Sequence, residues 1–154
     1  MTLDEMLAYR VAMLSGNLSE SLYSVYAPYD LTMPQWRIMA TLGTLHSEES
    51  NTESNNESNK DSIVSLTAKQ LVKATRLDKV TVTRALQQME RHRLIDKRQD
   101  TSDGRAVNVS LSTTGQNVYL KILPNVIRWQ EEKLASITDS EYQIFLKVID
   151  KLMS

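Results

Sequence analysis

The 154-residue sequence contains no cysteine, only four glycines and three prolines, and a single phenylalanine. The absence of cysteine excludes disulfide bonds, thiolate metal sites and sensing of oxidants through a reactive thiol. The few glycines form no phosphate-binding loop, and no carboxylate pair or nucleophile–base arrangement is present, so we do not expect an enzyme. His46 and His92 stand in different segments without a ligand cluster, so neither a metal site nor a cofactor is predicted.

Long apolar runs and a secretory signal pattern are also lacking, so we expect a cytoplasmic protein without a membrane partner. The length suits one domain with a core of its own. The net charge is only −1, but it is unevenly distributed: residues 67–110 carry ten Lys and Arg against five Asp and Glu, which leaves +5. A basic segment of this kind is the electrostatic footprint of nucleic-acid binding.

Residues 67–91 have the pattern of two helices joined by a tight turn. Thr67 can open the first helix with a capping box, and Asp78 is a plausible N-cap for the second. Residues at helical spacing predict the buried face of that second helix: Val82, Leu86 and Met89. Its opposite face carries groups that reach DNA bases and phosphates, although such a face can also be merely solvated. The DNA-contacting residues predicted here are Lys79, Thr81, Thr83, Arg84 and Gln88.

The segment that follows predicts a charged hairpin. Residues 94–99 and 106–111 have the pattern of short strands, and a polar, turn-rich segment joins them. Ile63 and Val64 can add a third strand, which completes the pattern of a winged helix. We expect Arg98 and Arg105 to lie in or beside the minor groove, with Asp103 orienting Arg105 through a charge-assisted hydrogen bond.

These segments also resemble a known family. The sequences LTMPQW at 31–36, DKVTVTR at 78–84, DGRA at 103–106 and LSTTG at 111–115 resemble the MarR (multiple antibiotic resistance regulator) family of bacterial transcription factors. The resemblance implies a mainly α fold with a small β wing, in which N- and C-terminal dimerisation helices flank a winged helix-turn-helix domain. It also implies a homodimer on a pseudo-palindromic operator in double-stranded DNA, usually a repressor that a small molecule releases.

Within one MarR-like domain, residues 1–30 and 116–154 are predicted to form the dimerisation helices. Residues 31–45 and 63–115 are predicted to form the DNA-binding lobe. Apolar residues between 3 and 26 recur at spacings of four and three, a seam suited to a partner helix. An intramolecular bundle is the alternative interpretation of that seam. Pro124 is expected to kink the helix that contains it or to interrupt one backbone bond.

Two features depart from the family pattern. Residues 46–62 contain no apolar residue and carry a net charge of −4, so we expect a disordered insert. This insert either hangs passively from the domain, which we favour, or competes with DNA for the basic lobe. Arg93 stands where the family usually has a left-handed glycine cap. Either the cap geometry differs here, or Arg93 accepts backbone strain for an extra phosphate contact.

In the family, ligands lie between the dimer helices and the DNA-binding lobe. Residues 10–15 resemble the branch that responds to aromatic carboxylates, including hydroxycinnamates and their coenzyme A thioesters. Arg10 would pair with a carboxylate or phosphate, or it is simply an exposed or salt-bridged residue. The predicted ligand site comprises Arg10, Met13, Leu14, Tyr23, Trp36 and Met39. Two alternatives stay open: a DNA-binding regulator without an effector, and a non-enzymatic helical protein-interaction module.

Overall fold

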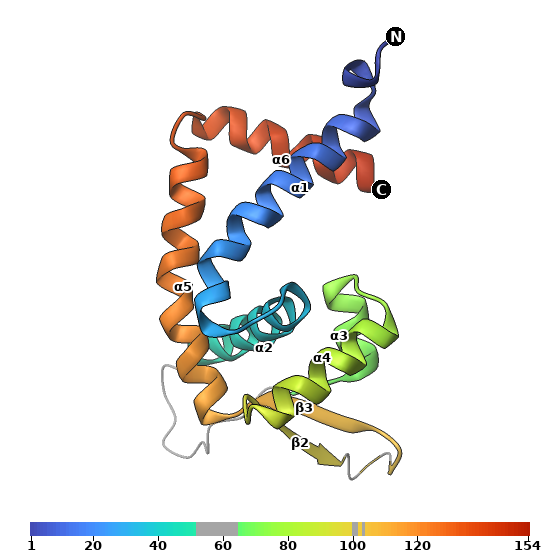
Figure 1. Cartoon of the computed structure of the whole chain (residues 1–154), viewed down its shortest axis with the longest axis vertical. Coiled ribbons are helices and arrows are strands. Elements are labelled where there is room, and N and C mark those ends of the chain that lie inside the picture. Colours follow the sequence, from blue (N-terminus) through green and yellow to red (C-terminus); the bar gives the residue numbers. More distant parts are fainter. Residues whose placement is uncertain (52–64, 100–101, 103) are drawn as a thin grey trace.

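The computed structural model describes residues 1–51, 65–99, 102 and 104–154, which form mainly helices, with one small sheet at one end of the molecule (Figure 1). The predicted fold class, mainly α with a small β wing, is confirmed. No helix within these ranges is long and apolar enough to cross a membrane. In chain order the elements are η1 (Leu3–Glu5), α1 (Leu7–Tyr26), η2 (Ala27–Tyr29), α2 (Met33–Asn51), β1 (Leu66–Thr67), α3 (Ala68–Thr75), α4 (Lys79–Arg91), β2 (Ile95–Gln99), β3 (Val107–Leu111), α5 (Thr113–Leu134) and α6 (Asp139–Met153).

Side-chain caps determine where three of the helices begin. The hydroxyl oxygens of Thr67, Ser112 and Thr138 each accept a hydrogen bond from the backbone N–H three residues later, at 3.2, 3.0 and 3.1 Å. Each bond satisfies one of the N–H groups that the first turn of a helix leaves without a partner. Such caps are readable from the sequence because the pattern is local, and the one predicted at Thr67 is confirmed.

The first two helices differ from the expected boundaries. A helix starting at Leu3 was expected, but the carboxylate of Glu5 accepts a hydrogen bond from Thr2 N–H at 2.7 Å and closes a separate 3₁₀ turn. Met6 is then extended (φ −77°, ψ 122°), and α1 begins after it. The second helix was expected to end near residue 45, yet α2 continues to Asn51. Extending a formed helix adds a hydrogen bond per residue without a new nucleation cost, so polar residues can prolong it.

Residues 46–51 of the expected insert therefore belong to α2, whereas residues 52–62 lie outside the described residues, as do Ile63 and Val64. The third strand of the sheet is β1 instead. The sheet is antiparallel in the order β1-β3-β2, with Leu66 opposite Val109 and Ile95 opposite Leu111.

Farther along the chain, α5 continues through Pro124, whose missing N–H does not end the helix.

The core lies where α2 crosses the other helices. Its fully buried members come from all parts of the lobe: Tyr26, Ile38, Met39, Leu42, Leu71, Val82, Met89, Val109 and Ile122. Three stacked rings join α1, α2 and α5, because Trp36 lies 5.6 Å from Tyr26 and 6.2 Å from Tyr119 between ring centroids. These contacts hold the C-terminal half of α1 and the first half of α5 against α2.

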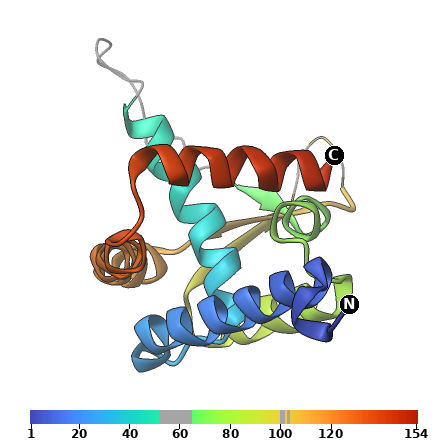
Figure 2. The same cartoon turned by 90° about the horizontal axis from the view of Figure 1, so that it is seen from above.

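The ends of the chain are packed differently. α6 has no buried residue, and α1 buries only Tyr26. The two helices overlap in Figure 1, but Figure 2 shows that they run apart from one another. Exposed apolar side chains therefore cover both helices, among them Leu7 and Val11 on α1 and Ile144, Phe145 and Leu152 on α6.

Gly115 gives a test of this packing. A Cβ at position 115 would lie 2.0 Å from the carbonyl oxygen of Leu94, which is backbone and cannot move aside alone. We expect Gly115→Ala to lower the free energy of unfolding by about 3 kcal/mol. The measurement is urea denaturation followed by circular dichroism.

The matched control is Gly16→Ala in α1, where an added Cβ would meet no atom within 4 Å. Alanine is the better helix former, so this variant should be neutral or more stable by up to about 1 kcal/mol. If both variants unfold at the same urea concentration, close approach to Leu94 is not the constraint at Gly115.

Candidate nucleic-acid interface

The helix-turn-helix consists of α3, a short turn and α4. α3 ends at Thr75, and its C-cap, Arg76, has a left-handed backbone (φ 59°) and donates its N–H to the carbonyl of Val72 at 3.1 Å. The turn then brings Asp78 to the start of α4. The buried face of α4 is formed by Val82, Ala85, Leu86 and Met89, so its opposite face is turned to solvent. The predicted buried residues of this helix are confirmed.

The predicted N-cap of α4 is also confirmed. The carboxylate of Asp78 accepts hydrogen bonds from the backbone N–H of Thr81 at 2.8 Å and from its hydroxyl at 2.7 Å. These bonds hold the pKa of Asp78 below its ordinary value, so the cap is charged at neutral pH. Because Thr81 is half-buried and gives its hydroxyl proton to Asp78, it serves the cap and has no proton left for a DNA phosphate.

Lys79, Thr83 and Arg84 all lie exposed on α4. Lys79 and Arg84 form no ion pair or hydrogen bond with any residue in the described ranges. Lys79 and Arg84 therefore stand in solvent without a partner in the described part of the chain, as contacts to phosphates and base edges require. That these residues touch DNA stays a prediction.

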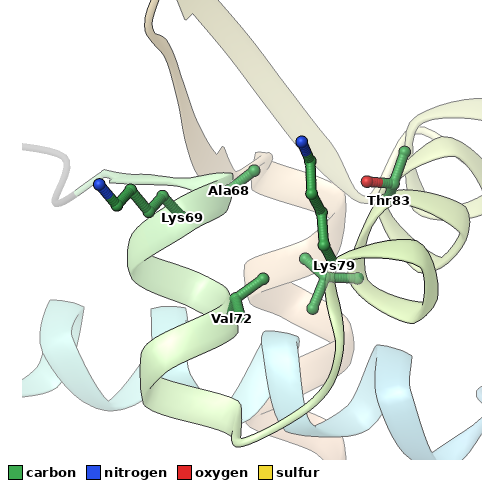
Figure 3. A pocket seen from close by; sticks show the side chains of 6 residues that line it. Ala68, Lys69, Val72, Lys79 and Thr83 are labelled. Carbon is green, nitrogen blue, oxygen red and sulfur yellow. The ribbon is translucent and has the colours of Figure 1, made fainter.

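A cavity of about 330 Å³ separates α3 from α4, with Val72 and Val82 among its apolar lining residues. Figure 3 shows Lys69 and Lys79 on either side of it, one from each helix. Lys69 was not among the predicted site residues, because it precedes the helix assigned to DNA contact. Its only sequence signal was membership of the +5 segment; the turn between the helices brings it beside α4.

The hairpin of β2 and β3 extends from this lobe as the expected wing. Arg98 on β2 is exposed, whereas Lys97 forms an ion pair with Glu90 at 2.8 Å. The side chain of Gln99 donates a hydrogen bond to the carbonyl of Gly104 near the tip. Arg105 follows, exposed, but Asp103 lies outside the described residues, so its predicted bond to Arg105 stays a prediction.

The junction between α4 and the wing resolves the alternatives for Arg93. Its backbone is left-handed (φ 57°), its N–H donates to Glu90 O at 3.0 Å, and the N–H of Leu94 donates to Met89 O at 2.9 Å. This pair of bonds is the Schellman motif that normally ends on glycine. The hydroxyl of Ser112 also donates to Arg93 O at 2.7 Å. The cap geometry is therefore retained, and arginine accepts the strain, while the extra phosphate contact stays a prediction.

The six residues predicted to bind a ligand do not line one cavity. Trp36 and Met39 are in the core, 7% and 0% exposed, and Tyr23 is exposed near the other end of α1 from Arg10. Arg10 and Met13 instead line an open cavity of about 410 Å³ together with Asp4 and Tyr9. Leu14 is exposed on the same helix. A complete pocket built from all six residues is therefore not present within one chain.

The strain at Arg93 predicts that glycine is better at this position. We expect Arg93→Gly to raise the free energy of unfolding by about 1 kcal/mol, since glycine adopts the left-handed conformation without a Cβ clash. The measurement is a thermal melt of each variant. Arg93→Ala keeps the Cβ, so its melting temperature should equal that of the natural protein. A lower melting temperature for the glycine variant would show that the arginine side chain stabilises the junction.

Comparison with known families and structures gives a consistent result. The model of the MarR family matches residues 56–106. None of the curated proteins compared with the chain matches it. A mutant MarR from E. coli complexed with operator DNA is 17% identical, with a TM-score of 0.78 over 96% of this chain and 94% of that one. The predicted resemblance to the MarR family is confirmed.

Two further solved structures share the whole fold. MepR from S. aureus, solved as a DNA complex, is 19% identical with a TM-score of 0.77, and the similarity covers 96% of each chain. BpsR from Bordetella bronchiseptica, whose DNA binding is regulated by 6-hydroxynicotinic acid, is 15% identical. Its TM-score is 0.79 over 100% of this chain and 97% of that one. The arrangement of helices and wing is thus the MarR winged-helix fold.

Proposed function

Because this chain has the MarR winged-helix fold and matches the family model over residues 56–106, we propose that it is a homodimeric DNA-binding transcriptional regulator. The observation that carries the proposal is the exposed face of α4, where Lys79 and Arg84 stand without protein partners among the described residues. Lys69 extends this basic surface onto α3, and Arg98 and Arg105 extend it along the wing. In this arrangement α4 would enter the major groove while the wing contacts the adjacent backbone or minor groove.

The homodimer is supported by the helices at the two ends of the chain. A 15-residue helix without a single buried residue, such as α6, gains too little from its own propensity to be stable in water. Its apolar side chains, with those of the N-terminal half of α1, would be buried by the same surfaces of a second copy. Two-fold symmetry would then place the two α4 helices about 34 Å apart, one turn of DNA, on a pseudo-palindromic operator.

DNA binding is tested by titrating the protein with the DNA that flanks its own gene and with a random duplex, at two salt concentrations. We expect salt-dependent, operator-selective binding of one dimer per palindrome. Arg84→Ala should reduce operator affinity by about 1–3 kcal/mol with a smaller loss on random DNA, because a base contact carries the preference. Arg105→Ala should weaken both duplexes alike and lower the salt slope by about one per protomer.

Arg128→Ala is the matched control, since it removes one exposed charge from α5 rather than from the basic surface. Its affinity should equal that of the natural protein. Equal losses on operator and random DNA for Arg84→Ala would remove this residue from the base-reading set. Equal binding of flanking and random DNA by the natural protein would count against an operator at this locus.

We further propose a repressor that a small aromatic carboxylate, or its coenzyme A thioester, releases from DNA. The support is the cavity beside Arg10, whose guanidinium can form two parallel hydrogen bonds with a carboxylate while Tyr9 and Met13 contact a ring. A thioester has no free carboxylate, so Arg10 would pair with one of its phosphates instead. Asp4 in the same cavity disfavours a second negative group there, so the other phosphates of the thioester would lie outside the cavity. The effector of BpsR, 6-hydroxynicotinic acid, is itself an aromatic carboxylic acid.

The ligand proposal is tested by adding 6-hydroxynicotinate, p-coumarate, ferulate and their thioesters to the preformed DNA complex. One of these compounds should release the DNA, and Arg10→Ala should raise the concentration needed by about tenfold or more, the loss of one charge-assisted hydrogen-bond pair. Affinity for DNA without ligand should not change. Release that is the same for Arg10→Ala and Arg128→Ala would exclude Arg10, and no release by any compound would favour a regulator without an aromatic effector.

A further inference from the structure

Gln35, in the first turn of α2, is a polar side chain with only 6% of its surface exposed. Its two amide atoms have different partners. The oxygen Oε1 accepts a hydrogen bond from the backbone N–H of Thr32 at 3.2 Å, and the nitrogen Nε2 donates to Oε1 of Gln88 at 2.6 Å. Gln88 belongs to α4, so this hydrogen bond links the buried Gln35 side chain of α2 directly to the helix proposed to contact DNA.

The hydrogen bond from Thr32 N–H to Gln35 Oε1 determines the orientation of both amide groups. A backbone N–H can only donate, so the atom of Gln35 that faces Thr32 has to be the carbonyl oxygen. The nitrogen of Gln35 then faces Gln88, and it in turn requires the carbonyl oxygen of Gln88 as its acceptor. The reverse orientation would place two N–H groups against each other at Thr32. The capping interaction of α2 therefore determines which amide atom of Gln88 does not bind Gln35.

The atom left over on Gln88 is the amide nitrogen. Gln88 is exposed, and its Nε2 donates to no residue in the ranges that the structure describes. It lies four residues after Arg84, and residues at that spacing are neighbours on one helix face. The free end of Gln88 is thus a pair of N–H donors beside Arg84 on the proposed DNA-facing surface.

We propose that Gln35 is a positioning residue for base recognition, which holds Gln88 so that it presents hydrogen-bond donors alone to the major groove. This inference rests on the proposed DNA-binding function. A free glutamine recognises adenine by turning one donor and one acceptor to the base together. Gln88 does not do so while its oxygen is directed at the buried Gln35, even though that oxygen has a second lone pair. Gln88 therefore favours a base edge that offers acceptors alone, guanine O6 and N7 or thymine O4. Adenine also accepts at N7, but its adjacent N6–H₂ group donates and needs an acceptor that Gln88 does not present.

The decisive variant is Gln35→Glu. A carboxylate has nearly the same shape and accepts from Thr32 N–H at a helix N-terminus, where glutamate is favoured, so α2 should keep its start. The introduced carboxylate cannot donate, so Gln88 should rotate its amide by half a turn, donate to that carboxylate and present its oxygen to the DNA. The preferred base at one symmetric position in each half-site should then change from one that accepts to one that donates, adenine N6 or cytosine N4.

Selection from a randomised half-site first identifies the base preferred at each position. The readout is then the ratio of affinities for two operator duplexes that differ in one base pair. A ratio cancels the uniform repulsion of DNA by the new charge. We expect the ratio to reverse by about three- to tenfold for each base contact, the effect of one hydrogen bond. Gln35→Met removes the nitrogen and oxygen that could bind Gln88. Both amide atoms of Gln88 are then available to DNA, so adenine should become the preferred base at the same position of the half-site. Circular dichroism and a thermal melt check that each variant is folded.

Gln88→Ala supplies the control. In a protein that already carries Gln88→Ala, Gln35→Glu should leave the base preference unchanged, because position 88 then has no amide group that could rotate. The proposal is overturned if Gln35→Glu selects the same site as the natural protein, if it weakens all sequences evenly, or if its effect survives in Gln88→Ala. A natural protein that binds no duplex selectively would instead refute the proposed function itself.

Discussion

The structure depends on one close approach, between the carbonyl of Leu94 and the first turn of α5. At that point the last turn of α4 has just ended, β2 begins, and β3 returns to the start of the long helix. Leu94 O accepts the N–H of Ser112 at 3.0 Å, and the absence of a side chain at Gly115 lets the helix lie against the same oxygen. The end of α4, the helix proposed to face DNA, is thus fixed through two backbone contacts to α5, which leads toward the proposed dimer surface. A displacement of α5 would have to move α4 and the wing together.

The features that the sequence allowed us to predict are those whose cause is local. A hydroxyl or carboxylate three residues ahead of its N–H partner is visible in the sequence, and the caps at Thr67, Asp78, Ser112 and Thr138 all formed. The period of apolar residues likewise identified the buried face of α4, since the spacing alone determines which side chains share a face. The positive-φ position at Arg93 was recognisable as unusual because a glycine was expected there, although only the structure showed which alternative held.

The features that could not be predicted require contacts between distant segments. Gln35 and Gln88 are 53 residues apart, and neither looks unusual in its own helix. Trp36 and Met39 suited both the core and a ligand pocket in the sequence, because aromatic and thioether groups fit either, and only their packing against α1 and α5 shows that they lie in the core. Lys69 became part of the basic surface only through the turn that brings α3 beside α4. The extension of α2 to Asn51 was missed because polar composition was taken to end a helix.

The separation of charge along this fold affects how the protein approaches DNA. With a net charge of −1, the molecule as a whole has almost no long-range attraction to a polyanion. Its basic surface and its acidic remainder form an electric dipole instead, and a dipole near DNA experiences a torque. The torque turns the wing and α4 toward the duplex within about 8 Å, the distance over which physiological salt leaves the field unscreened. Collisions should therefore be no more frequent than for a neutral protein, but a larger share of them should begin in the productive orientation.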